Sequence, residues 1–65
     1  MKTLPRMFAD ITARLEDAHA LAVEGQNRNA TPDMHRVLVC HLRASMAELD
    51  AALGDIKNRL GDAHV

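Results

Sequence analysis

The stretch TPDMHRVLVCHLRASMAELDAALGDIKNRL, residues 31–60, decides the fold of this 65-residue chain. It opens on Thr31, whose hydroxyl can accept a hydrogen bond from a free N–H group in the first turn of a helix. Pro32 suits the first helical position, because its missing N–H costs nothing there. No further proline follows, and the first glycine comes only at Gly54. The stretch therefore predicts one long helix over residues 32–60.

This predicted helix has two apolar faces. Large side chains recur at alternating steps of three and four residues, which is the spacing along which helices pack: they are Val39, Leu42, Met46, Leu49, Leu53, Ile56 and Leu60. Small residues form a second series: Cys40, Ala44, Ala47, Ala51 and Gly54. At 100° per residue the two series lie roughly 150° apart around the helix. We therefore expect this helix to have neighbours on both sides.

The preceding part of the chain repeats the pattern of large residues. Its series predicts a helix over residues 4–24 that begins beside Thr3 and Pro5, and its members are Leu4, Phe8, Ile11, Leu15, Ala18, Ala22 and Gly25. Asp10 and Arg14 are spaced to pair along this helix. Residues 25–31 are polar and predict a loop, in which Gly25 or Asn27 can take the left-handed conformation that ends a helix. Residues 61–65 are expected to fray.

The sequence thus predicts an all-α fold, with residues 1–65 forming one antiparallel two-helix hairpin. The expected seam for the core and the dimer contains Phe8, Ile11 and Leu15 from the first helix and Leu42, Met46 and Leu49 from the second, and we expect the part on the second helix to be shared between the first helix and a second chain. Because the second helix is longer by roughly 12 Å, we expect Ile56 to Leu60 to overhang and to expose apolar surface.

A chain of this size has few ways to stabilise itself alone. It buries only about 60% of the surface of the unfolded chain, and small domains usually need disulfides, a metal or a second subunit. Its single cysteine excludes an internal disulfide and favours a reducing compartment, and its single aromatic residue, Phe8, leaves the core thin. We therefore expect a homodimer, in which two hairpins form a four-helix arrangement.

The sequence shows no pattern typical of an active site or a metal site. His35 and His41 are six residues apart, whereas two ligands on one helix face lie three or four apart. Cys40 and His41 are adjacent, so they point about 100° apart and do not form a nucleophile–base pair. The three glycines are isolated and make no phosphate-binding loop. We expect no enzyme activity, no cofactor and no metal.

Charge and hydropathy narrow the expected partners further. The net charge is −1 and acidic and basic residues are mixed, whereas nucleic-acid binders carry a basic stripe. A small RNA-binding dimer of the Rop kind is an alternative with the same architecture, but Asp50 follows the aligned Arg36 and Arg43. No apolar run approaches the roughly 20 residues of a membrane span, and no secretory signal is apparent. We expect a cytoplasmic protein that contacts neither membrane nor nucleic acid.

The second predicted helix resembles two families of small helical proteins. Residues 41–53, HLRASMAELDAAL, with Met46, Leu49 and Leu53 followed by Ile56, resemble the C-terminal helix of quorum-sensing antiactivators of rhizobia and agrobacteria, the TraM and QseM kind. This resemblance implies a small, often dimeric helical protein that binds a LuxR-type transcription activator and blocks it.

The other resemblance is to the co-chaperones of type III secretion needle subunits, the YscE kind. It rests on residues 49–53, LDAAL, then Ile56, then Gly61 and Asp62. It implies a helical hairpin that holds a needle subunit.

Both resemblances agree with the apolar surface that a single hairpin leaves uncovered. We therefore expect a non-enzymatic protein that binds and sequesters a protein partner, most simply an antiactivator of a transcription activator. The residues expected to bind this partner lie on the small face and on the overhang: Cys40, Ala44, Ala47, Ala51, Leu53, Ile56 and Leu60.

Overall fold

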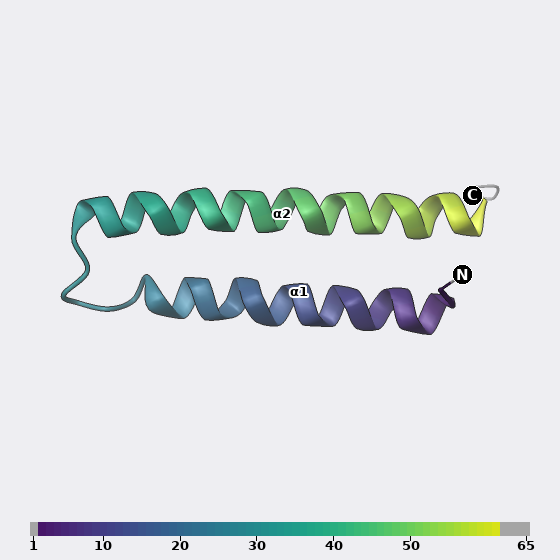
Figure 1. The fold of residues 1–65 in the computed structure, drawn as a ribbon, viewed down its shortest axis with the longest axis horizontal. Helices are drawn as coiled ribbons and strands as arrows, with labels where there is room; N and C mark the ends of the chain where they lie inside the picture. The colour runs from purple at the N-terminus through teal and green to yellow at the C-terminus, as the bar shows by residue number, and fades with distance from the viewer. Residues whose placement is uncertain (1, 62–65) are drawn as a thin grey trace.

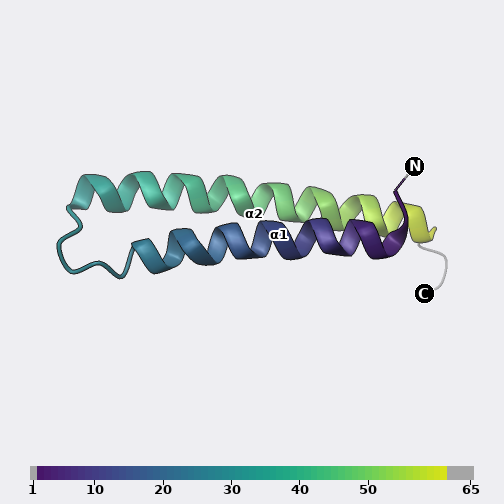
Figure 2. The same ribbon diagram turned by 60° about the horizontal axis from the view of Figure 1, so that its bottom comes forward.

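Two helices, packed side by side in opposite directions, form the whole of the described structure. The computed structural model describes residues 2–61, with α1 at Leu4–Glu24 and α2 at Pro32–Leu60. The helices run alongside each other over the length of α1 (Figure 1), and a view turned by 60° shows the same pairing (Figure 2). The predicted all-α antiparallel hairpin is confirmed. Of the residues predicted to fray, 61–65, Gly61 instead caps α2, and residues 62–65 lie outside the described residues.

Local sequence signals explain where each helix begins and ends. The hydroxyl of Thr3 accepts a hydrogen bond from the N–H of Arg6 at 3.3 Å, and that of Thr31 accepts one from the N–H of Met34 at 3.1 Å. At the far end of α2, Gly61 takes the left-handed conformation with φ 86°, and its N–H donates to the carbonyl of Lys57 at 3.1 Å. Glycine reaches this conformation without a steric penalty.

The end of α1 differs from the prediction. Gly25 is right-handed, with φ −67°, and the N–H groups of Gln26 and Asn27 continue into a tight turn by bonding to the carbonyls of Val23 and Glu24. A Cβ atom added at Gly25 would lie 3.3 Å from the carbonyl oxygen of Ala22 and 3.8 Å from Cδ1 of Leu38. The tight contact is therefore with the last turn of α1, and the contact with α2 is an ordinary van der Waals one.

The core between the helices is a single narrow row. Four apolar residues are buried, namely Ile11, Ala18, Leu49 and Ile56. Half-buried residues continue the row at steps of three and four, except for one step of seven from Ile11 to Ala18; they are Leu4, Met7 and Leu21 on α1, Gly25 at its C-cap, and Leu38, Leu42, Ser45 and Ala52 on α2. We call these twelve residues the hairpin seam.

The predicted seam, expected to serve both the hairpin core and a dimer, divides into two sets within one chain. Ile11 and Leu49 are buried and Leu42 is half-buried, but Phe8, Leu15 and Met46 are 54%, 52% and 46% exposed. Within one chain, these three residues are therefore not core. Around each helix, the hairpin seam is turned relative to the predicted series of large residues. Every second residue of that series therefore faces outward within one chain.

The predicted overhang at Ile56 is wrong. Ile56 is 5% exposed and belongs to the core cluster against which Leu4 and Met7 pack. The residue before α1 meets the last turn of α2 at this point, because Nη1 of Arg59 donates to the carbonyl of Lys2 at 2.7 Å. The extra length of α2 lies instead mainly at the loop end, where its first turn projects beyond α1 (Figure 1). There the His35 ring lies level with the end of α1, with Nε2 3.1 Å from the Gly25 carbonyl oxygen.

The hairpin is long and thin. Its extents are 48 × 20 × 17 Å and its radius of gyration is 15.2 Å, whereas a compact domain of this length would have about 11 Å. Its accessible surface is 5234 Å², whereas a compact monomer of 7.1 kDa exposes ~4,100 Å². Neither described helix is long and apolar enough to cross a membrane.

Candidate protein-binding surfaces

Large apolar side chains are left uncovered on both helices. Phe8 and Leu15 of α1 are about as exposed as Met46 and Leu53 of α2, at 54%, 52%, 46% and 51%. The two helices carry the same local pattern, because an acid follows two residues after Phe8 and after Met46, and a leucine follows seven residues after each. On a helix this spacing places the acid roughly 150° from both apolar residues.

The positions of the acids show on which side of the hairpin these exposed apolar side chains lie. Nη1 of Arg14 bonds to Oε1 of Glu48 across the hairpin at 2.9 Å, and Asp10 and Asp55 line one shallow hollow together with Arg14. The acids of α1 and α2 therefore share one side of the hairpin, which we call the charged side. Because the large apolar residues lie on the other flank of each helix, they share the opposite side.

This opposite side forms a continuous surface along the hairpin. Gly25 lies beside Leu38, and Ile11 clusters with Leu49, which fixes how the helices are aligned. Counting from these contacts gives three layers: Phe8 with Leu53, Leu15 with Met46, and Ala22 with Val39. We call these six residues the apolar face. It tapers from large side chains near the termini to smaller ones near the loop, and the 62% exposed Leu60 extends it beyond Leu53.

On the charged side, ion pairs connect the start of α1 to its second turn. The ammonium of Lys2 bonds to the Asp10 carboxylate, and Arg6 approaches the same group at 4.0 Å. The hydrogen bond from Lys2 is the main reason that the pKa of Asp10 is lowered, and the charges of Lys2, Arg6 and Arg14 add to it. The predicted pairing of Asp10 with Arg14 is replaced by these contacts, because Arg14 reaches Glu48 instead.

The small residues of α2 lie on its outer surface. Cys40, Ala44, Ala47 and Ala51 are exposed, and they lie roughly 160° around α2 from the residues that face α1. We call these four residues the small face. The structure separates them from the other predicted partner-binding residues: Leu53 belongs to the apolar face, Leu60 extends that face, and Ile56 is buried in the core. The residues predicted to bind from the small face thus share one exposed surface, whereas those predicted from the overhang are divided between the apolar face and the core.

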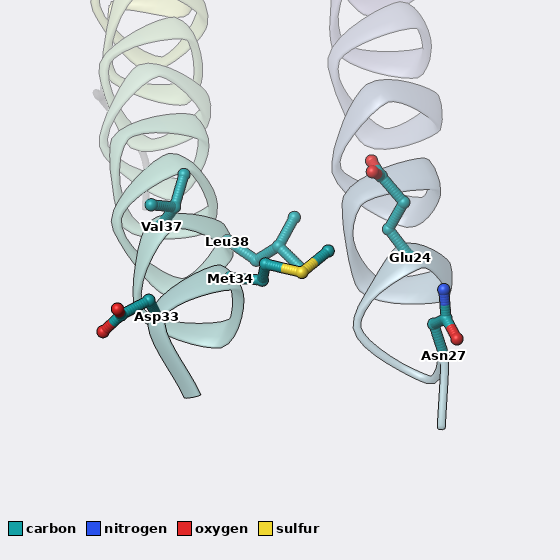
Figure 3. Close-up of a pocket in the computed structure, with 6 residues that line it drawn as sticks. All are labelled: Glu24, Asn27, Asp33, Met34, Val37 and Leu38. Atoms are coloured by element: carbon teal, nitrogen blue, oxygen red, sulfur yellow. The ribbon is translucent and has the colours of Figure 1, made fainter. Parts of the chain in front are cut away.

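A hollow of 350 Å³ at the loop end was not predicted. Its lining residues come from both helices and the turn between them: Glu24, Asn27, Asp33, Met34, Val37 and Leu38. The side chain of Met34 reaches from α2 toward α1, whereas Asp33 points away (Figure 3). Met34 and Val37 lie outside the series of large residues that the sequence indicates, so periodicity gives no signal for this hollow.

The hollow brings together no set of reactive groups. Its polar residues are two carboxylates and one amide, with no histidine or cysteine among them. Among residues 2–61, no group of three or more His, Cys, Asp or Glu side chains is placed to hold a metal ion.

Comparisons with known proteins add no constraint. No family model, no curated protein and no solved structure matches this chain.

Proposed function

We propose that this chain is a non-enzymatic protein that binds and sequesters another protein. The observation that carries the proposal is the imbalance between buried and exposed apolar residues in the described structure. Nine large apolar side chains are about half exposed, whereas four apolar residues are buried. Removal of apolar surface from water contributes about 25 cal/mol per Å². Protein contact is the direct way for a charged, two-helix chain to gain this stabilisation.

A transcription activator of the LuxR type is the partner that we favour. This choice rests on the resemblance of residues 41–53 to the quorum-sensing antiactivators, and the shape of α2 supports it. The small face presents short side chains over about three turns, so the axis of a partner helix can approach closely, since interaxial distance depends on the side chains at the contact. An amphipathic helix of the partner is the segment such a surface fits.

The alternatives predict different partners for the same hairpin. A needle-subunit co-chaperone would hold a secretion subunit, and an RNA-binding dimer would need an uninterrupted basic row. Arg36 is engaged by Asp33 at 2.5 Å, and Asp50 stands exposed in the same row. These contacts give the RNA alternative no support.

Affinity capture from the native cell tests the proposal. The tagged chain is expected to retain a LuxR-type regulator, and adding the purified chain is expected to prevent that regulator from activating its promoter. Retention of a needle subunit would favour the co-chaperone, and retention of RNA without protein would overturn the proposal.

A matched pair of variants tests the small face. Ala47→Glu should abolish capture, because a charged side chain would be buried in the contact, while Ala13→Glu on the exposed outer surface of α1 should not affect it. Glutamate is a good helix former, so circular dichroism should show both variants to be as helical as the original chain. Full capture by Ala47→Glu would show that the partner does not bind the small face.

A further inference from the structure

We infer that the apolar face is covered by a second copy of this chain, lying antiparallel to the first, so that the two hairpins form a four-helix bundle. The inference goes beyond the proposed function, because a second copy would cover six of the nine exposed large apolar side chains, Leu60 included, which leaves the small face for the captured partner. It assigns the two exposed surfaces to different tasks, because the small face stays on the outside of such a bundle.

The area that needs covering matches the area that a dimer buries. The hairpin exposes about 1,100 Å² more than a compact monomer of its mass. A standard protein interface removes about 800 Å² from each partner. A second copy with a standard interface would therefore cover most of an excess of this size, and the apolar face runs along the hairpin as a bundle interface requires.

The taper of the apolar face indicates the relative direction of the two copies. When the hairpins are antiparallel and centred on the layer of Leu15 and Met46, Phe8 of one copy meets Ala22 of the other, and Leu53 meets Val39. Large side chains then pack against smaller ones, which fills space without voids. In a parallel pair, the layer of Phe8 and Leu53 would meet itself, and the layer of Ala22 and Val39 would leave a gap.

Charges beside the apolar face fit the same arrangement. Arg43 and Asp50 lie on α2 one turn before and one turn after Met46, on the outer edge of the face. Neither forms an ion pair with another residue between 2 and 61. In the antiparallel bundle, α2 faces α2 of the second copy about the Met46 layer, which places Arg43 of each copy opposite Asp50 of the other. This pair occurs twice by symmetry.

Light scattering on the purified chain at about 100 μM tests the association. The original chain is expected to show twice its mass of 7.1 kDa. Leu15→Glu should be monomeric, because it places a charge at the centre of the interface. Val37→Glu is the matched control, since Val37 is exposed to the same degree but lies off the apolar face, and it should stay dimeric. A monomeric original chain, or a Leu15→Glu variant that stays dimeric, would overturn the inference.

A charge exchange tests the interface without a core-facing substitution. Arg43→Asp should raise the dissociation constant of the dimer roughly tenfold, since each of two exposed ion pairs is replaced by a repulsive pair. Adding Asp50→Arg to the same chain should restore the original constant, because each new aspartate again faces an arginine. A double variant that dimerises no better than Arg43→Asp alone would contradict the antiparallel pairing, even if Leu15→Glu fails to fold.

Spin labels at the loop report the direction directly. In a Cys40→Ala background, Arg28→Cys places one label in the loop of each copy. Antiparallel copies separate the two labels by about the 48 Å length of the hairpin. Parallel copies would bring the labels within about 30 Å, the width of two to three helices, and this shorter distance would overturn the antiparallel arrangement. Capture of a partner is not measured here, so this result and the test of the small face can fail independently.

Discussion

The two halves of the hairpin differ in how they are packed. The terminal half contains the start of α1 and the end of α2, and the loop half contains the end of α1, the loop and the start of α2. In the terminal half, Ile11, Leu49 and Ile56 are buried together, and Leu4, Met7 and Ala52 pack against them. In the loop half, Ala18 is the one described residue that is buried, and a 350 Å³ hollow lies beside Met34 and Leu38. Both halves have helices of similar regularity, so packing rather than helix geometry separates them.

The difference shows what holds each half together. The terminal half is stabilised by apolar burial and by Arg59, which bonds to the carbonyl of Lys2. The loop half depends more on polar contacts at helix ends, such as the Thr31 cap and the contact of the His35 ring with the Gly25 carbonyl. Elements with few buried contacts open at lower free energy than the core. We therefore expect the loop half to open first.

The largest expected effect comes from removing core from the terminal half. Leu49→Ala should lower the free energy of unfolding by about 2–5 kcal/mol, because it deletes most of a buried side chain. Leu38→Ala makes the same chemical change at a half-buried site in the loop half and should cost roughly 1–2 kcal/mol. Urea unfolding of both variants at one chain concentration measures the difference. Equal losses would show that the two halves are equally packed.

A smaller loss is expected from the cap at the loop end. Thr31→Ala should cost about 1 kcal/mol, because the N–H of Met34 loses the hydroxyl that accepts its hydrogen bond. Thr12→Ala is the control: the Thr12 hydroxyl donates to the Phe8 carbonyl within a regular helix, so its loss should change stability by less than about 0.5 kcal/mol. Hydrogen exchange should show the loss first at residues 34–38. A loss spread evenly over both helices would argue against separate opening of the loop half.

The terminal half has its own helix cap at Gly61. Substitution of alanine for the two glycines in this half should change the stability of the chain in opposite directions. Gly61→Ala should destabilise the chain by about 1 kcal/mol, because alanine is strained at φ 86°. Gly54→Ala should stabilise it by about 0.5–1 kcal/mol, since an added Cβ at this helical position would meet nothing within 4 Å. Thermal melts of the two variants give the comparison. A stabilising Gly61→Ala would show that the cap conformation is wrong.

The smallest expected effect is a change in how the stability of the folded chain falls at acidic pH. The pKa of Asp10 is lowered in the folded chain, chiefly by the hydrogen bond from Lys2, so the unfolded chain binds this proton more readily. The resulting stabilisation is present above the ordinary pKa near 3.8 and disappears as the pH falls through the lower, folded pKa. Asp10→Asn should therefore flatten the fall in stability below about pH 4, and Lys2→Ala should do the same. An unchanged acid profile in both variants would contradict the contact.

Much of the fold follows from local signals that the sequence states plainly. Thr31 and Pro32 begin α2, Gly61 ends it, and both helices have the predicted bounds. The prediction for the candidate surfaces was less complete because the hairpin seam contains residues that do not look like core. Ser45 lies in the seam, and the spacing of its members places Arg14 between Ile11 and Ala18. A seam predicted from hydrophobicity therefore includes the larger neighbours Leu15 and Met46, which face outward within one chain.

The misplaced overhang has a geometric origin. Length arithmetic alone does not say at which end the longer helix projects. That depends on the path of residues 25–31, and the contacts of Gly25 with His35 and Leu38 set the path by placing the second turn of α2 beside the end of α1. Such contacts join residues ten or more positions apart, and a periodic pattern within each helix carries no information about them.

The elongated outline, 48 Å long and at most 20 Å across, also determines how the molecule moves through water. A rod of this axial ratio, about 2.5, experiences more friction than a sphere of the same mass, so a lone hairpin elutes early from a sizing column. A second hairpin laid alongside adds thickness without adding length, which gives a rounder particle with a lower frictional ratio. Doubling the mass therefore shifts the elution volume less than it would for two particles of one shape. Sedimentation velocity resolves the two states better, because the greater mass and the lower friction both raise the sedimentation coefficient of the pair.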